Sequence, residues 1–328
     1  MSFRFEGKAY EGDPCETVLE ALLRQDVALP YSCRKGLCQV CLVRSAETAP
    51  PAASQIGLRD TLRHQGYFLA CQCPATEGLD ISLARAADVF IPATVIAKQQ
   101  LSTEVYKIEL MPAGTMAYHP GQFINLRRAD GLSRSYSIAS VPQTDNSIEI
   151  HVQRRENGLM SQWLIDTLQP GEHLEIDGPN GMCFYLPGNE ADPLLMIGTG
   201  TGLAPLIGIV RDALLRAHSG PIYLYHGSRS PAGFYARQQL LAMAALHPQL
   251  HVHFCVSGEN LDQDCLPGYA SKNAFARHGD LSGFRVYLCG APEMVNNAKK
   301  TAYLQGAQIK NIYADPFENL DKRNVQRN

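Results

Sequence analysis

Three cysteines lie close together in the stretch YSCRKGLCQVC, which runs from Tyr31 to Cys41. Cys33, Cys38 and Cys41 have the spacing C-x4-C-x2-C, and Cys71 follows later in FLACQC. The chain holds ten cysteines among 328 residues, a density far below that of secreted disulfide scaffolds. We therefore expect reduced thiols, and reduced thiols packed this closely indicate a metal site that constrains the fold of the first part of the chain.

The spacing separates two kinds of metal site. Zinc sites usually present two C-x2-C pairs, whereas here only Cys38 and Cys41 form such a pair. One loop with C-x4-C-x2-C and a distant fourth cysteine is the plant-type [2Fe–2S] pattern. We predict such a cluster on Cys33, Cys38, Cys41 and a fourth thiol, with a structural zinc site or buried free thiols as the alternative. Cys71 and Cys73 are both candidates for the fourth ligand.

The surrounding residues read as a small domain. Gly36 supplies the positive φ that a loop curling around a cluster requires. FRFEGKAY and LDISL alternate like strands, and TVLEALLRQ has helical spacing. Residues 1–86 resemble a β-grasp [2Fe–2S] ferredoxin. In that family the fourth ligand is the first cysteine of a pair such as Cys71 and Cys73, so the resemblance implies Cys71. Gln39 departs from the family, which usually has glycine directly after the second cysteine.

Composition excludes several classes of function. The chain is 45% hydrophobic and 19% charged, with a formal charge of −3, and it contains no basic run of the kind that nucleic-acid binding needs. No segment approaches the roughly 18 apolar residues of a membrane span, and the N-terminus has no apolar signal region. We expect a cytoplasmic, monomeric protein of two or three domains, without nucleic-acid or membrane partners.

A second region reads as an antiparallel barrel over residues 91–187, after a short linker at 84–90. Alternating segments separated by Gly and Pro predict strands at 92–100, 105–112, 121–128, 147–155 and 172–179. RSYSIAS and ENGLMSQWL within it together resemble the flavin domain of the ferredoxin–NADP reductase superfamily. The resemblance implies FAD, with Arg134 at the pyrophosphate, Tyr136 on the flavin ring and Ser137 near flavin N5. The other flavin contacts that we expect are Ser135, His151, Val152, Gln153, Gly158, Met160 and Ser161.

A third region, residues 188–318, opens with the strand–turn–helix sequence DPLLMIGTGTGLAPLIGIVRDALL, a context that holds phosphates. Its glycines depart from the dinucleotide fingerprint G-x-G-x-x-G, because Leu203 takes the place of the third glycine. G-T-G-x-G-x-x-P, HGSR and YLCGAPEMV instead resemble the nicotinamide domain of the same superfamily, with Cys289 flanking the nicotinamide. The contacts that we expect are Gly198, Thr199, Gly200, Thr201, Gly202, Pro205, Gly227, Ser228, Arg229, Cys289, Gly290 and Phe317. Residues 319–328 form a polar tail.

The order ferredoxin, flavin barrel, nicotinamide domain resembles the single-chain reductases of bacterial multicomponent oxygenases, the group of benzoate dioxygenase and phenol hydroxylase reductases. The resemblance implies electron transfer from NADH through FAD and the [2Fe–2S] cluster to a terminal oxygenase, with Ser137 and Cys289 as catalytic residues. A flavin is needed because NADH delivers a hydride while the acceptor takes single electrons. Reductases of a deoxysugar dehydrase or of a separate ferredoxin, and a non-enzymatic redox sensor, are alternatives.

The choice between NADH and NADPH depends on charges near the adenosine ribose. In the superfamily that this region resembles, members that prefer NADPH carry an arginine after the strand that corresponds to LHVHFCVS, and this chain places Glu259 close to that position. A carboxylate there repels a 2′-phosphate, so we predict NADH. Arg229 and Arg237 oppose this prediction, and Gly233 stands where relatives often carry an acid.

Overall fold

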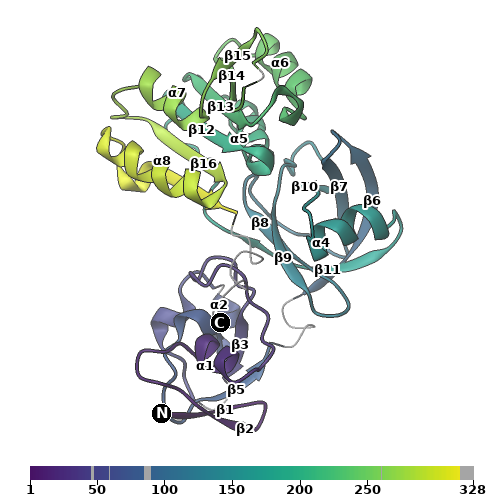
Figure 1. Ribbon diagram of the computed structural model, residues 1–328, viewed down its shortest axis with the longest axis vertical. Coiled ribbons are helices and arrows are strands. Elements are labelled where there is room, and N and C mark those ends of the chain that lie inside the picture. Colours follow the sequence, from purple (N-terminus) through teal and green to yellow (C-terminus); the bar gives the residue numbers. More distant parts are fainter. Residues whose placement is uncertain (46–47, 59, 85–89, 260, 318–328) are drawn as a thin grey trace.

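Three sheets follow one another along the chain (Figure 1); the first two each pack on one buried core, and the third has a buried core on each face. The computed structural model describes residues 1–317 except 46–47, 59, 85–89 and 260. The predicted tail and nearly all of the predicted linker therefore lie outside the described residues. Within the described part of the chain, no helix combines the length and apolar character that crossing a bilayer requires.

The first sheet confirms the β-grasp prediction. Its strand order is β2-β1-β5-β3-β4, and apolar residues of α1 pack against its inner face. The helix begins at Thr17, whose hydroxyl accepts the N–H of Glu20 while the Glu20 carboxylate accepts the N–H of Thr17. The elements are β1 (Ser2–Phe5), β2 (Lys8–Glu11), α1 (Val18–Arg24), β3 (Leu42–Ser45), α2 (Asp60–His64), β4 (Tyr67–Leu69) and β5 (Asp80–Leu83).

The second sheet is the predicted antiparallel barrel, with strand order β10-β7-β6-β11-β8-β9. An isolated bridge between Ile138 and Ile150 joins the two outer strands, so the sheet closes on itself. A short helix covers one end and continues into a π-helical turn at Trp163–Thr167. The elements are β6 (Ile91–Gln100), β7 (Val105–Pro112), β8 (Phe123–Arg127), β9 (Ser133–Ser137), β10 (Ile148–Gln153), α4 (Leu159–Gln162) and β11 (His173–Asn180).

The third sheet is parallel, as the continuous apolar strands predict, with order β15-β14-β13-β12-β16-β17. Alternate residues of β12 face different cores: Leu194 and Met196 pack with α5 and α6, and Leu195 and Ile197 pack with α7 and α8. The elements are β12 (Leu194–Thr199), α5 (Leu203–Leu215), β13 (Ile222–Ser228), α6 (Arg237–Leu246), β14 (Leu250–Val256), β15 (Cys265–Pro267), α7 (Ala270–Arg277), β16 (Arg285–Gly290), α8 (Pro292–Leu304) and β17 (Ile312–Pro316).

The barrel contacts both other domains (Figure 1). On one side, the Asn125 amide of β8 donates a hydrogen bond of 3.0 Å to the carbonyl oxygen of Cys38. On the other, Asp145 pairs with Arg211 of α5 at 2.6 Å, and His151 hydrogen-bonds the Tyr235 hydroxyl at 3.0 Å. The barrel therefore stands between the cysteine loop and the parallel sheet.

Candidate functional site

The cysteine loop aims its backbone N–H groups at sulfur. The N–H groups of Lys35 and Cys38 lie 3.3 and 3.4 Å from Cys33 Sγ, and the Cys33 N–H lies 3.3 Å from Cys38 Sγ. The Gly36 N–H approaches Cys71 from the same loop. Backbone donors around sulfur stabilise thiolates, the form in which cysteine binds iron.

The four predicted thiols form two pairs. Contact with Cys38 lowers the pKa of Cys33 to about 5, and contact with Cys33 raises the pKa of Cys38. Cys41 and Cys71 behave likewise, with contact between the thiols raising the pKa of Cys41 and lowering that of Cys71 to about 7. Among the described residues, no three His, Cys, Asp or Glu side chains gather as they do around a single metal ion. Two thiol pairs suit a binuclear cluster, in which each iron takes two protein thiolates.

Cys73, the other candidate for fourth ligand, has different surroundings. Its Sγ lies 3.5 Å from the Pro74 carbonyl oxygen and contacts the Ser54 hydroxyl. Burial raises the pKa of the Cys73 thiol to about 11, which disfavours the thiolate. The structure thus brings Cys71, and not Cys73, into contact with the loop cysteines.

Two loop positions show why backbone conformation matters here. Gly36 has the predicted positive φ, at +77°, and a Cβ atom on it would lie 2.9 Å from the Gln72 side chain. Gln39 also lies in the left-handed region, at +57°, where glycine is the easier residue. Its side-chain amide donates to the Gly57 carbonyl at 3.1 Å, an anchor that glycine could not supply.

Strand β9 carries the flavin motif of the sequence. Its side chains alternate in direction, so Ser135 and Ser137 share one face and Arg134 and Tyr136 share the other. The Ser137 hydroxyl donates to Asp315 Oδ2 at 2.7 Å, which ties the end of β9 to β17. Burial raises the pKa of Asp315 to about 6. Ser137 therefore lies between the barrel and the parallel sheet, where a flavin and a nicotinamide would have to meet.

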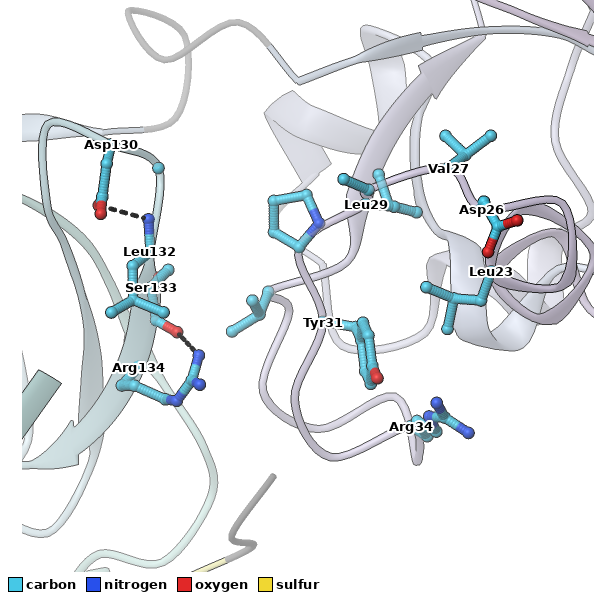
Figure 2. Close-up of a pocket in the computed structure, with 14 residues that line it drawn as sticks. Leu23, Asp26, Val27, Leu29, Tyr31, Arg34, Asp130, Leu132, Ser133 and Arg134 are labelled. Atoms are coloured by element: carbon cyan, nitrogen blue, oxygen red, sulfur yellow. Dashed lines mark hydrogen bonds between the residues drawn. The ribbon is translucent and has the colours of Figure 1, made fainter. Parts of the chain in front are cut away.

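A cleft of about 680 Å³ opens beside the start of β9 (Figure 2). Ser133 and Arg134 line its barrel wall, and Tyr31 and Arg34 of the cysteine domain line the opposite wall. The buried Ser133 hydroxyl has no hydrogen-bond partner in the described structure. An arginine on the wall of a cleft of this size suits the diphosphate part of a dinucleotide.

The remaining predicted flavin contacts come from β10 and α4. Gly158 caps α4, and the Ser161 hydroxyl bonds the Arg155 N–H and the Gly158 carbonyl oxygen, both at 3.2 Å. Met160 is buried in the barrel core. Both ring nitrogens of His151 are hydrogen-bonded, one to Glu149 at 2.8 Å and one to Tyr235 at 3.0 Å. The His151 side chain thus joins two domains, and the Gln153 amide bonds Glu104 at 3.0 Å.

The predicted nicotinamide residues meet at the carboxyl edge of the parallel sheet, where α/β folds bind ligands. In the strand register, Thr199 of β12 pairs with Gly227 of β13, and Gly198 pairs with Cys289 of β16. Close packing demands the glycine turn, since a Cβ atom on Gly202 would lie 2.3 Å from the Cys289 carbonyl oxygen. Pro205 lies in the first turn of α5, and the Phe317 N–H bonds the Gly290 carbonyl oxygen at 2.8 Å.

The charged residues near the ends of β13 and β14 differ in how far they are already engaged by partners. Glu259 and Arg229 are exposed, and the Gly258 N–H bonds the Arg229 carbonyl oxygen at 3.0 Å, so the two strand ends lie side by side. Arg237 is engaged elsewhere, because it pairs with Asp262 at 2.8 Å and Asp264 at 3.2 Å. Arg237 is therefore poorly placed to clamp a phosphate, whereas Arg229 keeps an exposed side chain.

Comparison with known proteins identifies the arrangement. Family descriptions match consecutive parts of the chain: 2Fe-2S iron-sulfur cluster binding domain at 4–76, oxidoreductase FAD-binding domain at 92–185 and oxidoreductase NAD-binding domain at 196–300. The ferredoxin–NAD(P)+ reductase component of the Pseudomonas putida naphthalene 1,2-dioxygenase system is 30% identical over 306 residues, 92% of this chain and 93% of its own. The chain belongs to this reductase family.

Two further relatives agree. The reductase subunit of an Amycolatopsis aromatic O-demethylase is 32% identical over 325 residues, 95% of this chain and 96% of that protein. The crystal structure of the Amycolatopsis reductase GcoB superimposes with a TM-score of 0.69 at 29% identity, covering 96% of this chain and 98% of that one. The reductase is therefore an NAD(P)H-dependent oxidoreductase that moves electrons through FAD and a [2Fe–2S] cluster, which confirms the predicted fold, cofactors and reaction class.

Sequence patterns missed three residues of this region. Asp315, in YADPF, bonds Ser137 and points its backbone N–H at Cys289, so both predicted catalytic residues contact it. Cys183 is buried, and its Sγ lies 3.7 Å from Cys289 Sγ. Asn125, in GQFINLRR, reaches the cysteine loop. The available signals were an amide, Asn125, in the middle of an apolar strand and an acid, Asp315, near the end of another, although such residues are common in strands.

Proposed function

We propose that this reductase takes electrons from NADH and delivers them to a terminal oxygenase or hydroxylase, acting as a cytoplasmic monomer. Relatives named as components of naphthalene dioxygenase and xylene/toluene monooxygenase systems support the acceptor class. None of the ten cysteines forms a disulfide, as expected in a reducing compartment. One chain carries all three cofactor domains, so electron transfer up to the cluster needs no second subunit.

The observation that carries the proposal is the continuity of the site across three domains. Cys33, Cys38, Cys41 and Cys71 are the proposed cluster ligands, since they form two thiol pairs within the cysteine domain. Arg134, Tyr136 and Ser137 are the proposed flavin contacts, and Cys289 and Gly290 the proposed nicotinamide contacts. The Ser137–Asp315 hydrogen bond joins the flavin motif to the nicotinamide domain. The Asn125–Cys38 hydrogen bond joins the barrel to the cluster loop.

Each set of residues has a defined task in the reaction. When bound, FAD accepts a hydride from NADH and releases its electrons one at a time. When NADH binds, the glycine turn before α5 and the edge at Gly290 would hold its nicotinamide near β9. Asp315 orients the Ser137 hydroxyl by accepting a hydrogen bond from it.

The acceptor is tested by reconstitution. We expect purified reductase to lose its flavin and cluster absorbance when NADH is added anaerobically, and to regain it when an oxidised Rieske-type or diiron oxygenase is added. A deoxysugar dehydrase component and a free ferredoxin serve as competing acceptors. Faster reoxidation by either of these than by every oxygenase offered would reject the proposed acceptor class and leave the internal electron path standing.

We predict that the reductase prefers NADH to NADPH. In the wild type, kcat/KM should be higher for NADH than for NADPH, because the exposed Glu259 carboxylate repels a 2′-phosphate and Arg237 is held by Asp262 and Asp264. Glu259→Arg should shift the ratio of the two kcat/KM values about tenfold toward NADPH, since it replaces a repulsive charge with an attractive one.

The control for this prediction is Glu77→Arg, which makes the same charge change at an exposed position of the cysteine domain. It should leave the ratio unchanged. A wild type that prefers NADPH contradicts the assignment and would make Arg229 the residue to examine.

A further inference from the structure

A row of polar side chains crosses three adjacent barrel strands and faces the cysteine loop. In the strand register Asn125 of β8 stands directly opposite Ser135 of β9 on one side and Asp177 of β11 on the other. Side chains directly opposite in a sheet lie close enough to bond. The Ser135 hydroxyl donates to Asn125 Oδ1 at 2.7 Å, and Asn125 Nδ2 donates to Asp177 Oδ2 at 3.0 Å.

The second hydrogen of the same amide leaves the barrel. Asn125 Nδ2 also donates to the carbonyl oxygen of Cys38 at 3.0 Å, across the boundary between two domains. The orientation of the amide follows from its partners, because a carbonyl and a carboxylate oxygen accept hydrogen bonds and can face only the NH2 group. Three partners thus hold one side chain in a single orientation, in a position that is 1% exposed.

Burial makes this contact costly to lose. Asp177 is buried along with Asn125, so removal of the amide leaves buried acceptors without that donor. Because Cys38 contributes only its backbone oxygen, the contact fixes the position of the loop rather than the chemistry of the thiol. The row therefore connects the strand of the flavin motif, at Ser135, to a residue that holds the cluster.

We propose that Asn125 is a positioning residue for electron transfer: it docks the cluster loop against the barrel and supplies the hydrogen-bonded connection between the β9 flavin motif and Cys38. The proposal rests on the cluster ligands proposed above. One electron passes from the reduced flavin to the oxidised cluster at a time, and the residue itself is neither oxidised nor reduced. Asn125 acts by fixing the distance and orientation between the two cofactors.

The test uses the full-length holoprotein with Asn125→Ala and Asn125→Asp. Asn125→Asp keeps the shape of the side chain but sets a carboxylate against Asp177 and the Cys38 carbonyl. The control is Asn180→Ala. Asn180, at the end of β11, is also buried and its side-chain amide donates to the same Asp177 at 3.5 Å. Each variant is measured for FAD content, cluster absorbance, NADH–ferricyanide activity, NADH–cytochrome c activity and radius of gyration by small-angle X-ray scattering.

Ferricyanide accepts electrons from reduced flavin directly, whereas cytochrome c takes them from the cluster. We expect both Asn125 variants to keep FAD, cluster and ferricyanide activity within about twofold of wild type. Cytochrome c reduction should fall about tenfold, because loss of one buried hydrogen bond changes the equilibrium between the docked and undocked cluster loop by about that factor. The radius of gyration should increase, and Asn180→Ala should match the wild type in all five measurements.

Other outcomes overturn the inference. If the two activities fall together, or if neither changes and the scattering curve stays that of the wild type, Asn125 does not position the cluster. If both Asn125 variants lose their cofactors while Asn180→Ala keeps them, the role is structural. A wild type without cluster absorbance would instead reject the proposed cluster ligands, and that result is separate from any effect of Asn125.

Discussion

Replacement of Cys71 by serine should abolish the [2Fe–2S] absorption spectrum while leaving FAD bound and NADH–ferricyanide activity intact. Cys71 contacts Cys41, and the Gly36 N–H approaches its sulfur, so it completes the second thiol pair. Changing a neighbour of a metal ligand typically weakens metal retention about 10- to 100-fold, and removal of the ligand itself should exceed that. Iron content and the visible spectrum of the purified variant measure the effect.

Cys73→Ser is the matched control for this prediction, two residues away and equally a buried thiol. Its partners are the Pro74 carbonyl oxygen and the Ser54 hydroxyl, both of which a serine hydroxyl can also bond. We expect wild-type iron content. The assignment fails if Cys73→Ser loses iron and Cys71→Ser keeps it.

A second large effect should appear at β9, where binding and chemistry separate. Ser137→Ala should slow flavin reduction by NADH about 10²- to 10³-fold, the usual cost of removing a preorganised hydrogen-bonding group beside a reacting atom. Arg134→Ala should instead weaken FAD binding about 10- to 100-fold, since it removes a charge-assisted contact from the cleft. Anaerobic stopped-flow absorbance measures the first effect, and fluorescence titration of the apoprotein with FAD measures the second.

Ser147→Ala controls for the loss of a hydroxyl in the barrel, because Ser147 bonds only Glu109, at 3.2 Å, among the residues described. It should change neither quantity. Equal changes in FAD affinity and hydride-transfer rate for Ser137→Ala and Arg134→Ala would contradict the division of roles between them.

Local features of this chain could be predicted because they depend on neighbours in sequence. The C-x4-C-x2-C spacing places three thiols on one loop, the helix from Val18 begins at the Thr17 capping box, and Gly36 has its positive φ. The positions of five of the barrel strands followed from alternation and turn residues. Each of these features follows from spacing or backbone conformation within one element.

Contacts between domains could not be predicted in the same way. Ser137 and Asp315 are 178 residues apart, and Asn125 and Cys38 are 87 apart. No periodicity relates such residues, because their distance depends on how finished domains pack. Tyr235, which hydrogen-bonds His151 across the boundary between barrel and parallel sheet, looked like an ordinary loop residue. Resemblance to a family predicted the parts of the site, and the structure supplied the contacts between them.

The contact from Asn125 to the cysteine loop has a consequence for building chimeric reductases. Its acceptor is a main-chain carbonyl oxygen, a group that every amino acid presents, so the barrel makes no demand there on the identity of the loop side chain. A ferredoxin module from another protein could satisfy the same donor if its loop follows the same backbone path. Exchange of redox modules on this barrel is thus limited by loop shape more than by loop sequence.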